Sequence, residues 1–272
     1  MISMLHRKFT TAIRLYRTQG TQKVWSVISK KLRYFWAKFS LPLRPSHIVV
    51  DGCHFDLTDP LITTEAKIAL FAGQYEEYER PAIRQFIPRN FPVIELGAGM
   101  GVVSCITNRL LTQPISHLVV EANPYVLKLT EQNRVRNNCQ FTIVNAALGY
   151  DTAEITLFID EAYFVFSNAK RPTSKSVQVR TMRLQQMIDQ LDSNVVSVIC
   201  DIEGMEVDLV EHEIEVLANH VAVFLFEEHS INVGQDAIDR VFKNLEQHDF
   251  ERVHHDGDVH VFVNRRIFSQ AV

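Results

Sequence analysis

From Phe91 onward, apolar runs of strand length alternate with helical patterns along the chain. This alternation is typical of parallel strands joined by covering helices, and it predicts an α/β fold with a doubly wound, Rossmann-like sheet. The last two apolar runs are separated only by Asp256-Gly257-Asp258, which predicts a closing antiparallel hairpin. The expected strands are Val93 to Leu96, His117 to Val120, Phe141 to Val144, Val195 to Cys200, Val221 to Phe226, Phe250 to His254 and Val259 to Val263. The expected helices are Val102 to Leu111, Pro124 to Asn137, Met205 to Ala218 and Ala237 to Gln247.

Composition excludes several other classes of protein. Of the 272 residues, 46% are hydrophobic and 22% are charged, which is typical of a folded globular protein. No 18 apolar residues run together, and the start of the chain has no signal-peptide pattern. The four cysteines are scattered singly, which argues against a zinc site or a disulfide framework. We therefore expect a cytoplasmic protein whose cysteines are small buried side chains.

Charge is distributed very unevenly along the chain. Residues 1–50 contain ten Lys or Arg and no Asp or Glu, whereas the other residues carry 18 bases and 32 acids. The apolar residues of this segment recur at helical spacing, so residues 1–45 are expected to form a basic amphipathic helical arm. Two interpretations stay open: residues 1–40 contact an anionic membrane surface, or they pack against the acidic body or a second subunit. The apolar face consists of Val24, Trp25, Ile28, Leu32, Phe35, Trp36 and Phe39.

Two further units are expected after this arm. Residues 46–90 begin with a hairpin through Asp51-Gly52 and continue in a helix from Thr64 to Ile87 that breaks near Gly73. We expect this unit to cap the substrate side of the core, residues 91–272. Within the core, Glu154 to Ile159 and Val177 to Thr181 predict an added ribbon or lid.

A glycine-rich turn follows the first core strand, in the sequence Glu95-Leu96-Gly97-Ala98-Gly99-Met100-Gly101. Glycines at a strand-to-helix turn let the backbone approach a ligand closely. The third glycine comes one residue too early for the dinucleotide pattern. A carboxylate at Glu95 would repel a pyrophosphate but suits the amino group of an amino-acid-bearing nucleoside. We therefore expect Glu95, Gly97, Gly99 and Gly101 to bind such a cofactor.

The ends of the next two strands extend this site. Glu121 ends the second strand, where a carboxylate can accept hydrogen bonds from two ribose hydroxyls. It could also simply favour the start of the helix that follows Pro124. Asn145 and Ala146 follow the third strand, where an adenine edge would lie.

These elements, in this order, resemble class I S-adenosylmethionine-dependent methyltransferases. The sequence D-x-E-G-x-E at Asp201 to Glu206 resembles the FkbM family more specifically, as does Gly73-Gln74-Tyr75-Glu76 with Glu79. The resemblance covers about residues 50 to 263. It implies S-adenosylmethionine as cofactor and O-methylation of a hydroxyl on a sugar, glycan, glycolipid or secondary metabolite. It departs at two points, since the family usually has Asp where this chain has Glu95, and Asn or a similar residue at Gly99-Met100.

Acidic residues and a histidine follow the fourth and fifth strands, where an open parallel sheet binds ligands. A hydroxyl needs a base that accepts its proton, and the candidates are Asp201, Glu203 and His229. Position favours Asp201, and a pKa near neutrality favours His229. Mg²⁺ bound by Asp201, Glu227 and Glu228 is an alternative that we rank below metal-free base catalysis. The residues expected on the substrate side are Tyr75, Glu76, Glu206 and Glu227.

Other functions remain as alternatives. One is a catalytically inactive scaffold or regulatory protein that keeps the nucleoside site. The glycine spacing disfavours an NAD-dependent dehydrogenase. We expect no nucleic-acid partner, because the body is acidic and would repel a polyanion.

Overall fold

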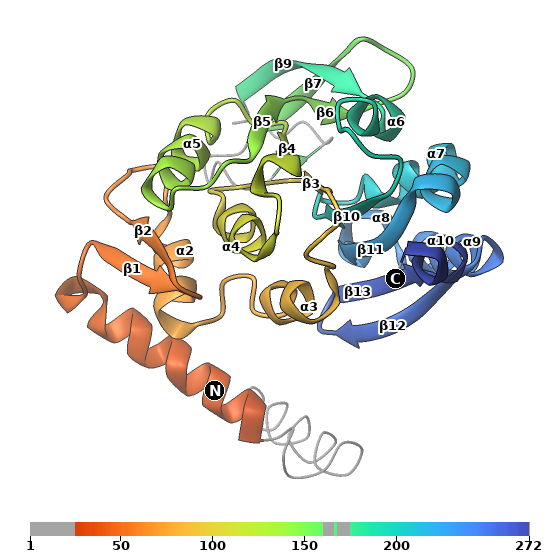
Figure 1. Cartoon of the computed structure of the whole chain (residues 1–272). Helices are drawn as coiled ribbons and strands as arrows, with labels where there is room; N and C mark the ends of the chain where they lie inside the picture. Colours follow the sequence, from red (N-terminus) through yellow and green to blue (C-terminus); the bar gives the residue numbers. More distant parts are fainter. Residues whose placement is uncertain (1–24, 160–165, 168–174, 272) are drawn as a thin grey trace.

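A central sheet with helices on both faces organises the computed structural model, which describes residues 25–159, 166–167 and 175–271 (Figure 1). The described residues place seven strands in this sheet, in the order β12-β13-β11-β10-β3-β4-β5. The predicted α/β fold class is confirmed. The strands are β3 (Val93–Leu96), β4 (His117–Glu121), β5 (Thr142–Asn145), β10 (Val196–Cys200), β11 (Val221–Glu227), β12 (Phe250–Asp256) and β13 (Val259–Asn264).

The sheet topology defines where a ligand would bind. Strands β5, β4, β3, β10 and β11 are parallel, and β13 pairs antiparallel with both β11 and β12, which confirms the predicted closing hairpin. The chain turns from β3 toward β4 and β5 on one side, and later enters β10 and β11 on the other. The carboxyl ends of β3 and β10 therefore form the topological switch point, where open α/β sheets bind their ligands.

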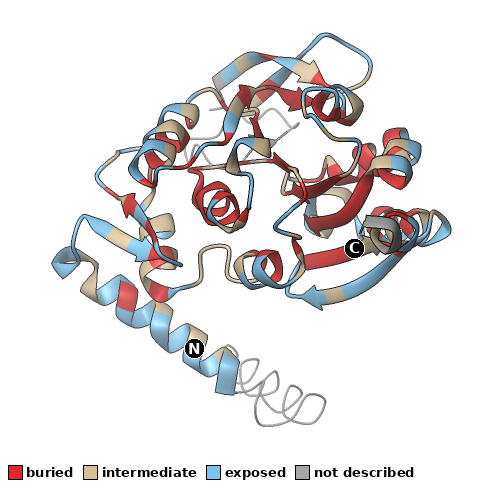
Figure 2. Ribbon diagram, in the orientation of Figure 1, coloured by how far each residue is buried: buried red, intermediate tan, exposed pale blue. Residues whose placement is uncertain are grey.

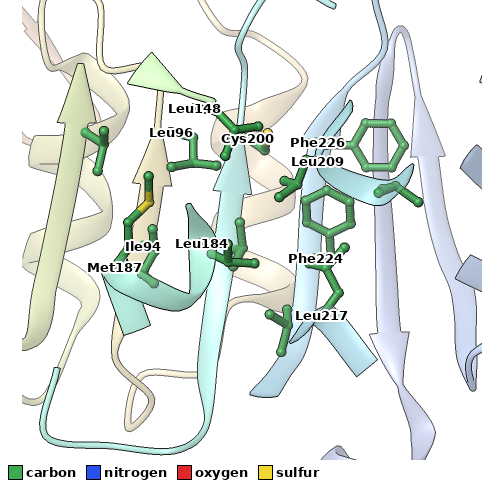
Figure 3. Close-up of a cluster of buried hydrophobic side chains, with 14 of the residues drawn as sticks. Ile94, Leu96, Leu148, Leu184, Met187, Cys200, Leu209, Leu217, Phe224 and Phe226 are labelled. Carbon is green, nitrogen blue, oxygen red and sulfur yellow. The ribbon is translucent and has the colours of Figure 1, made fainter. Parts of the chain in front are cut away.

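The strand residues alternate between two apolar layers, because successive side chains of a strand point to opposite faces. Ile94 and Leu96 face the layer that contains Leu209 and Phe224 (Figure 3). Val93 faces the opposite layer, which contains Ile83 of the helix α3 (Glu79–Phe86). Burial on both faces explains why these strands are almost continuously apolar in sequence.

The helices follow the prediction with shifted ends. The helix α5 begins at Leu127 rather than at Pro124, because Asn123 forms a turn in which its side-chain oxygen accepts the Tyr125 N–H at 3.0 Å. Three short helices, α6, α8 and α10, were not predicted. The helices of the core are α4 (Val102–Leu110), α5 (Leu127–Arg136), α6 (Leu184–Ile188), α7 (Glu206–His220), α8 (Ser230–Val233), α9 (Gln235–Gln247) and α10 (Arg265–Ala271).

The segment before the core contains the predicted hairpin and a broken helix. Strands β1 (His47–Val50) and β2 (Cys53–Asp56) pair antiparallel, and the helical segment is divided into α2 (Thr64–Ala72) and α3 (Glu79–Phe86). Gly73 ends α2 in the left-handed conformation, with a φ of 72°, so the predicted break is confirmed. Residues 25–40 form a helix that precedes the 3₁₀ turn η1 (Leu41–Leu43).

The predicted ribbon is present as part of a separate four-stranded sheet. Strands β7 (Glu154–Ile159) and β9 (Lys175–Met182) pair antiparallel, flanked by the short strands β6 (Ala147–Leu148) and β8 (Phe166–Ser167). Residues 160–165 and 168–174, which make up most of the intervening polar stretch, lie outside the described residues.

Two expectations from composition can be compared with the structure. All four cysteines are free and buried, as expected. Within the described ranges, no helix combines the length and the apolar composition that crossing a membrane requires.

Candidate functional site

The turn after β3 joins three strand ends at the switch point. Gly97 has a φ of +86°, and a Cβ built on it would lie 1.8 Å from the backbone oxygen of Asp201, so only glycine fits. The Gly97 N–H donates to the Val120 carbonyl, and the Asp201 N–H donates to the Leu96 carbonyl, both at 2.9 Å. The turn is therefore held tightly between the ends of β4 and β10.

Glu121 lies directly against this turn. Its carboxylate is 2% exposed and accepts hydrogen bonds from the N–H groups of Ala98 and Gly99 at 2.9 Å and of Asn123 at 2.7 Å. Burial raises the pKa of Glu121, and the three N–H donors oppose this rise. A carboxylate offers about four lone-pair sites, so acceptor capacity remains for a ligand hydroxyl.

Two adjoining cavities open at the turn. The larger has a volume of about 480 Å³ and is within the usual range for small-molecule sites. The smaller, of about 80 Å³, has an apolar wall that includes Ala146, Leu148 and Leu157. The two cavities share Gly97, Glu121, Asp201 and Glu203.

Glu95 does not reach these cavities, so the prediction that it binds cofactor is wrong. It is fully buried, its Oε1 accepts a hydrogen bond from the Ser104 hydroxyl, and its Oε2 lies 3.2 Å from His117 Nε2. The alternation of side chains along β3 turns Glu95 toward α4, inside the protein. Its role is to pair with buried polar groups.

Two other predicted cofactor residues act indirectly. Gly101 lines neither cavity, and a Cβ there would lie 3.0 Å from Thr130 Cγ2, so this glycine permits close packing of α4 on α5. Asn145 also lines neither cavity, because its amide donates to the carbonyls of Glu121 and Ala122 at 2.8 and 3.1 Å. Gly99 lines the larger cavity and Ala146 the smaller one, so both stay candidates for cofactor binding.

The D-x-E-G-x-E segment forms a strained loop between β10 and α7. Asp201 and Glu203 line both cavities, and Glu203 has a φ of 57°, which is unusual for a residue with a side chain. Glu206 is fully buried and accepts the N–H groups of Ile202 at 2.9 Å and Gly204 at 2.8 Å. The prediction that Glu206 lies on the substrate side is wrong, because the Glu206 carboxylate is buried and binds the N–H groups of the loop.

His229 connects this buried acid to the cavity. Its Nδ1 lies 3.1 Å from Glu206 Oε1, and its Nε2 lies 3.4 Å from Asp201 Oδ1 and 3.7 Å from Glu203 Oε2. Burial alone would lower the pKa of His229, but the hydrogen bond to Glu206 and the charges of the three carboxylates raise it to about 9. The expectation of a pKa near neutrality is therefore wrong, and His229 carries a positive charge at pH 7.

Asp201 also belongs to a cluster of four carboxyl groups. One oxygen each of Glu76, Glu79, Asp201 and Glu227 lies within 4.8 Å of the others. Burial and the neighbouring acids raise the pKa of Asp201 well above its usual range, and burial and Glu76 raise that of Glu227 to about 7. Carboxyl groups packed in this way share protons, so the cluster titrates as a unit.

The cluster differs from the predicted set of Mg²⁺ ligands. Glu228 is directed away from it and lies 3.1 Å from His260 Nε2, so its predicted place beside Asp201 is wrong. Glu79, which was noted in the sequence only as part of a motif, is 2% exposed and has a buried Oε1 without a hydrogen-bond partner. Its position three residues after Glu76 was the feature of the sequence that could have identified it. Only the fold shows that Glu76 and Glu79 both lie at the end of β10.

The unit before the core supplies one wall of the larger cavity. Tyr75 and Glu76, which were predicted on the substrate side, line it together with Thr63, Glu65 and Ala66 at the start of α2. Burial raises the pKa of the Tyr75 hydroxyl, so it stays neutral and can donate a hydrogen bond. No motif in the sequence had indicated the contribution of α2.

Comparisons with known proteins give low-identity matches. No family model and no curated protein matches the chain. Among solved structures, the methyltransferase FkbM from Methylobacillus flagellatus KT matches with 13% identity over 85% of this chain and 59% of that chain, at a TM-score of 0.41. Precorrin-6y C5,15-methyltransferase from Geobacter metallireducens GS-15 matches with 14% identity over 77% and 91%, at 0.41. Aeropyrum pernix fibrillarin with bound S-adenosyl-L-methionine matches with 14% identity over 64% and 66%, at 0.39. Values this low carry no information about the substrate.

Proposed function

We propose that this protein is an S-adenosylmethionine-dependent O-methyltransferase of the FkbM type, acting on a hydroxyl of a sugar, glycan, glycolipid or secondary metabolite. The observation that carries the proposal is the position of Asp201. It borders both cavities beside the glycine turn, and its carboxylate lies 3.4 Å from the half-buried His229.

The residues around the turn fit an amino-acid-bearing nucleoside. Gly97 leaves room for a close backbone approach, Glu121 offers its remaining acceptor site to a ribose hydroxyl, and the apolar wall at Ala146 suits a flat base. When bound, S-adenosylmethionine supplies a methyl group on a positively charged sulfonium. The carboxylates around the larger cavity favour a positive charge there.

The chain's own part in the reaction is to position the acceptor and remove its proton. Asp201 accepts the proton of the acceptor hydroxyl, because burial has raised its pKa and made it a stronger base than an exposed carboxylate. The positive charge of His229 favours the ionised form of Asp201 and opposes the rise of its pKa, and Glu206 fixes the ring of His229. Residues 46–90, which include Tyr75, cap the side of the cavity where the acceptor binds.

The reaction is tested by incubating the protein with radiolabelled S-adenosylmethionine and a panel of sugars, glycolipids and hydroxylated metabolites. Transfer to a hydroxyl that survives chelation by EDTA supports metal-free base catalysis at Asp201. Loss of transfer on chelation, restored by Mg²⁺, would assign the cluster of four carboxyl groups as a metal site, since Mg²⁺ prefers such oxygens. Binding of the nucleoside without transfer to any acceptor would favour the scaffold alternative.

The pH dependence of kcat gives a sharper test. We expect kcat to rise with pH through neutrality, because Glu227, whose pKa is raised to about 7, and Asp201, whose pKa is raised well above its usual range, must lose protons. In Glu227→Gln the rise is expected at lower pH, because the negative charge that raises the pKa of Asp201 is gone. A rise that stays at the same pH in this variant, or that moves to higher pH, would contradict the assignment. Glu228→Gln is the matched control, because Glu228 is the next acid along the chain, pairs with His260 and is not part of the carboxyl cluster.

A further inference from the structure

One side of the helix at residues 25–40 is fixed to the body. Ala37 is 2% exposed and packs with Ile68 and Ala72 of α2. Lys30 Nζ lies 3.0 Å from Glu77 Oε1 and donates to the Tyr78 hydroxyl at 2.8 Å, while its carbonyl accepts the Gln74 side chain at 2.7 Å. The contacts that hold the helix are therefore made by Ala37, Lys30 and the partly buried Tyr34, whereas its tryptophans and phenylalanines stay exposed.

The helix lies at the edge of the body, and most of its residues are exposed (Figures 1 and 2). An α-helix turns about 100° per residue, so the six large apolar residues centre about 180° from Lys30 and Ala37. Trp25, Trp36 and Phe39 are 68%, 62% and 75% exposed, and Phe35 packs edge-on against Trp36 and stacked on Phe39. The exposed apolar face consists of Trp25, Ile28, Leu32, Phe35, Trp36 and Phe39.

Basic residues border this apolar face on both sides. Lys31 and Lys38 lie along one flank and Arg33 along the other, each roughly 80–120° from the centre of the apolar face. All three are exposed. An apolar stripe with tryptophan, bordered by lysine and arginine, is the arrangement that binds in the plane of a lipid surface.

We propose that the apolar face of residues 25–39 binds the surface of an anionic lipid bilayer, with the helix lying in the plane of that surface. Charge decides between this occupant and a second copy of the chain. Residues 1–50 carry ten bases and no acid, so two copies that met through this face would bring like charges together. Anionic headgroups instead attract each basic residue near the surface.

Intrinsic fluorescence can follow this binding directly, because Trp25 and Trp36 are the two tryptophans of the chain and both lie on the apolar face. The full-length protein is mixed with phosphatidylcholine vesicles that contain about 30% phosphatidylserine, and with pure phosphatidylcholine vesicles. We expect a blue shift of the emission and co-flotation with the anionic vesicles, both weakened by high salt. The pure phosphatidylcholine vesicles are expected to bind at least tenfold more weakly.

Two sets of variants distinguish binding through this face from nonspecific hydrophobic binding. The double variant Leu32→Ser and Phe39→Ser keeps both tryptophans and is expected to weaken binding to anionic vesicles at least tenfold. The matched control, Ile115→Ser with Ile231→Ser, removes two exposed apolar side chains elsewhere and is expected to bind like the unaltered protein. Equal binding by Leu32→Ser/Phe39→Ser and the unaltered protein would overturn the proposal. So would a dimer in light scattering whose emission is already blue-shifted without vesicles, because that result would assign the face to a second copy.

Discussion

Gly97→Ala is expected to lower the free energy of unfolding by about 3 kcal/mol and to abolish nucleoside binding. A Cβ at this position would lie 1.8 Å from the backbone oxygen of Asp201, and backbone at the end of β10 cannot move without shifting the sheet. The turn must therefore open, and it is the turn that positions Glu121 through the N–H groups of Ala98 and Gly99. Urea unfolding and calorimetric titration with S-adenosylhomocysteine measure the two effects.

Gly52→Ala is the matched control for this variant. Gly52 has a φ of +82°, close to that of Gly97, but a Cβ there would meet nothing within 4 Å. It therefore carries the backbone cost of alanine in the left-handed region, about 1 kcal/mol, without the clash. Equal loss of stability in the two variants would show that the close approach of Gly97 to Asp201 is not what requires glycine.

Asp201→Asn is expected to lower kcat by about 100- to 10,000-fold, the usual range for loss of a general base. The same change removes one of four neighbouring carboxyl groups, so the melting temperature is expected to stay the same or to rise. Loss of activity together with unchanged or higher stability distinguishes a catalytic carboxylate from a structural one. It is measured by steady-state kinetics and thermal unfolding at pH 7.

Two controls define the meaning of that result. Glu228→Gln changes an acid near the same end of the sheet that pairs with His260, and it is expected to keep kcat within about twofold. Glu206→Gln is expected to lower both kcat and stability, because Glu206 binds the loop N–H groups and His229. If Asp201→Asn retained kcat within about tenfold, Asp201 would not be the base.

The fold was predictable because each element has a local cause. The apolar runs of β3, β4 and β10 lie between two helical layers, so their sequences are continuously apolar. Gly73 and the turn at Asp256-Gly257-Asp258 mark chain reversals by residue type alone. The start of α5 was missed because an Asn123 turn precedes the helix.

The site residues were predictable only where the end of a strand alone determines their position. Gly97, Glu121 and Asp201 follow three adjacent strands and do line the cavities. The predicted role of Glu95 was wrong because the alternation of side chains along β3 turns it into the interior. The predicted role of Glu206 was wrong because its partners are loop N–H groups, which no spacing rule identifies. The raised pKa of His229 depends on three carboxylates that only the tertiary structure gathers.

The orientation of the helix at residues 25–40 also could not be predicted from the sequence. The periodicity identified an apolar face and left open what covers it. The structure shows that the body contacts the opposite side, through Ala37 and Lys30, because α2 and the residues after it offer small and acidic partners there.

The most direct test of the proposed function is calorimetric titration of the purified protein with S-adenosylhomocysteine, with NAD as the control ligand. We predict saturable binding of the homocysteine nucleoside and no signal with NAD. In Glu121→Ala we predict binding about 100-fold weaker, because loss of a charged hydrogen-bond acceptor is worth about 1.5–3 kcal/mol. No binding by the unaltered protein, or equal binding by Glu121→Ala, would contradict the assignment of this site to S-adenosylmethionine.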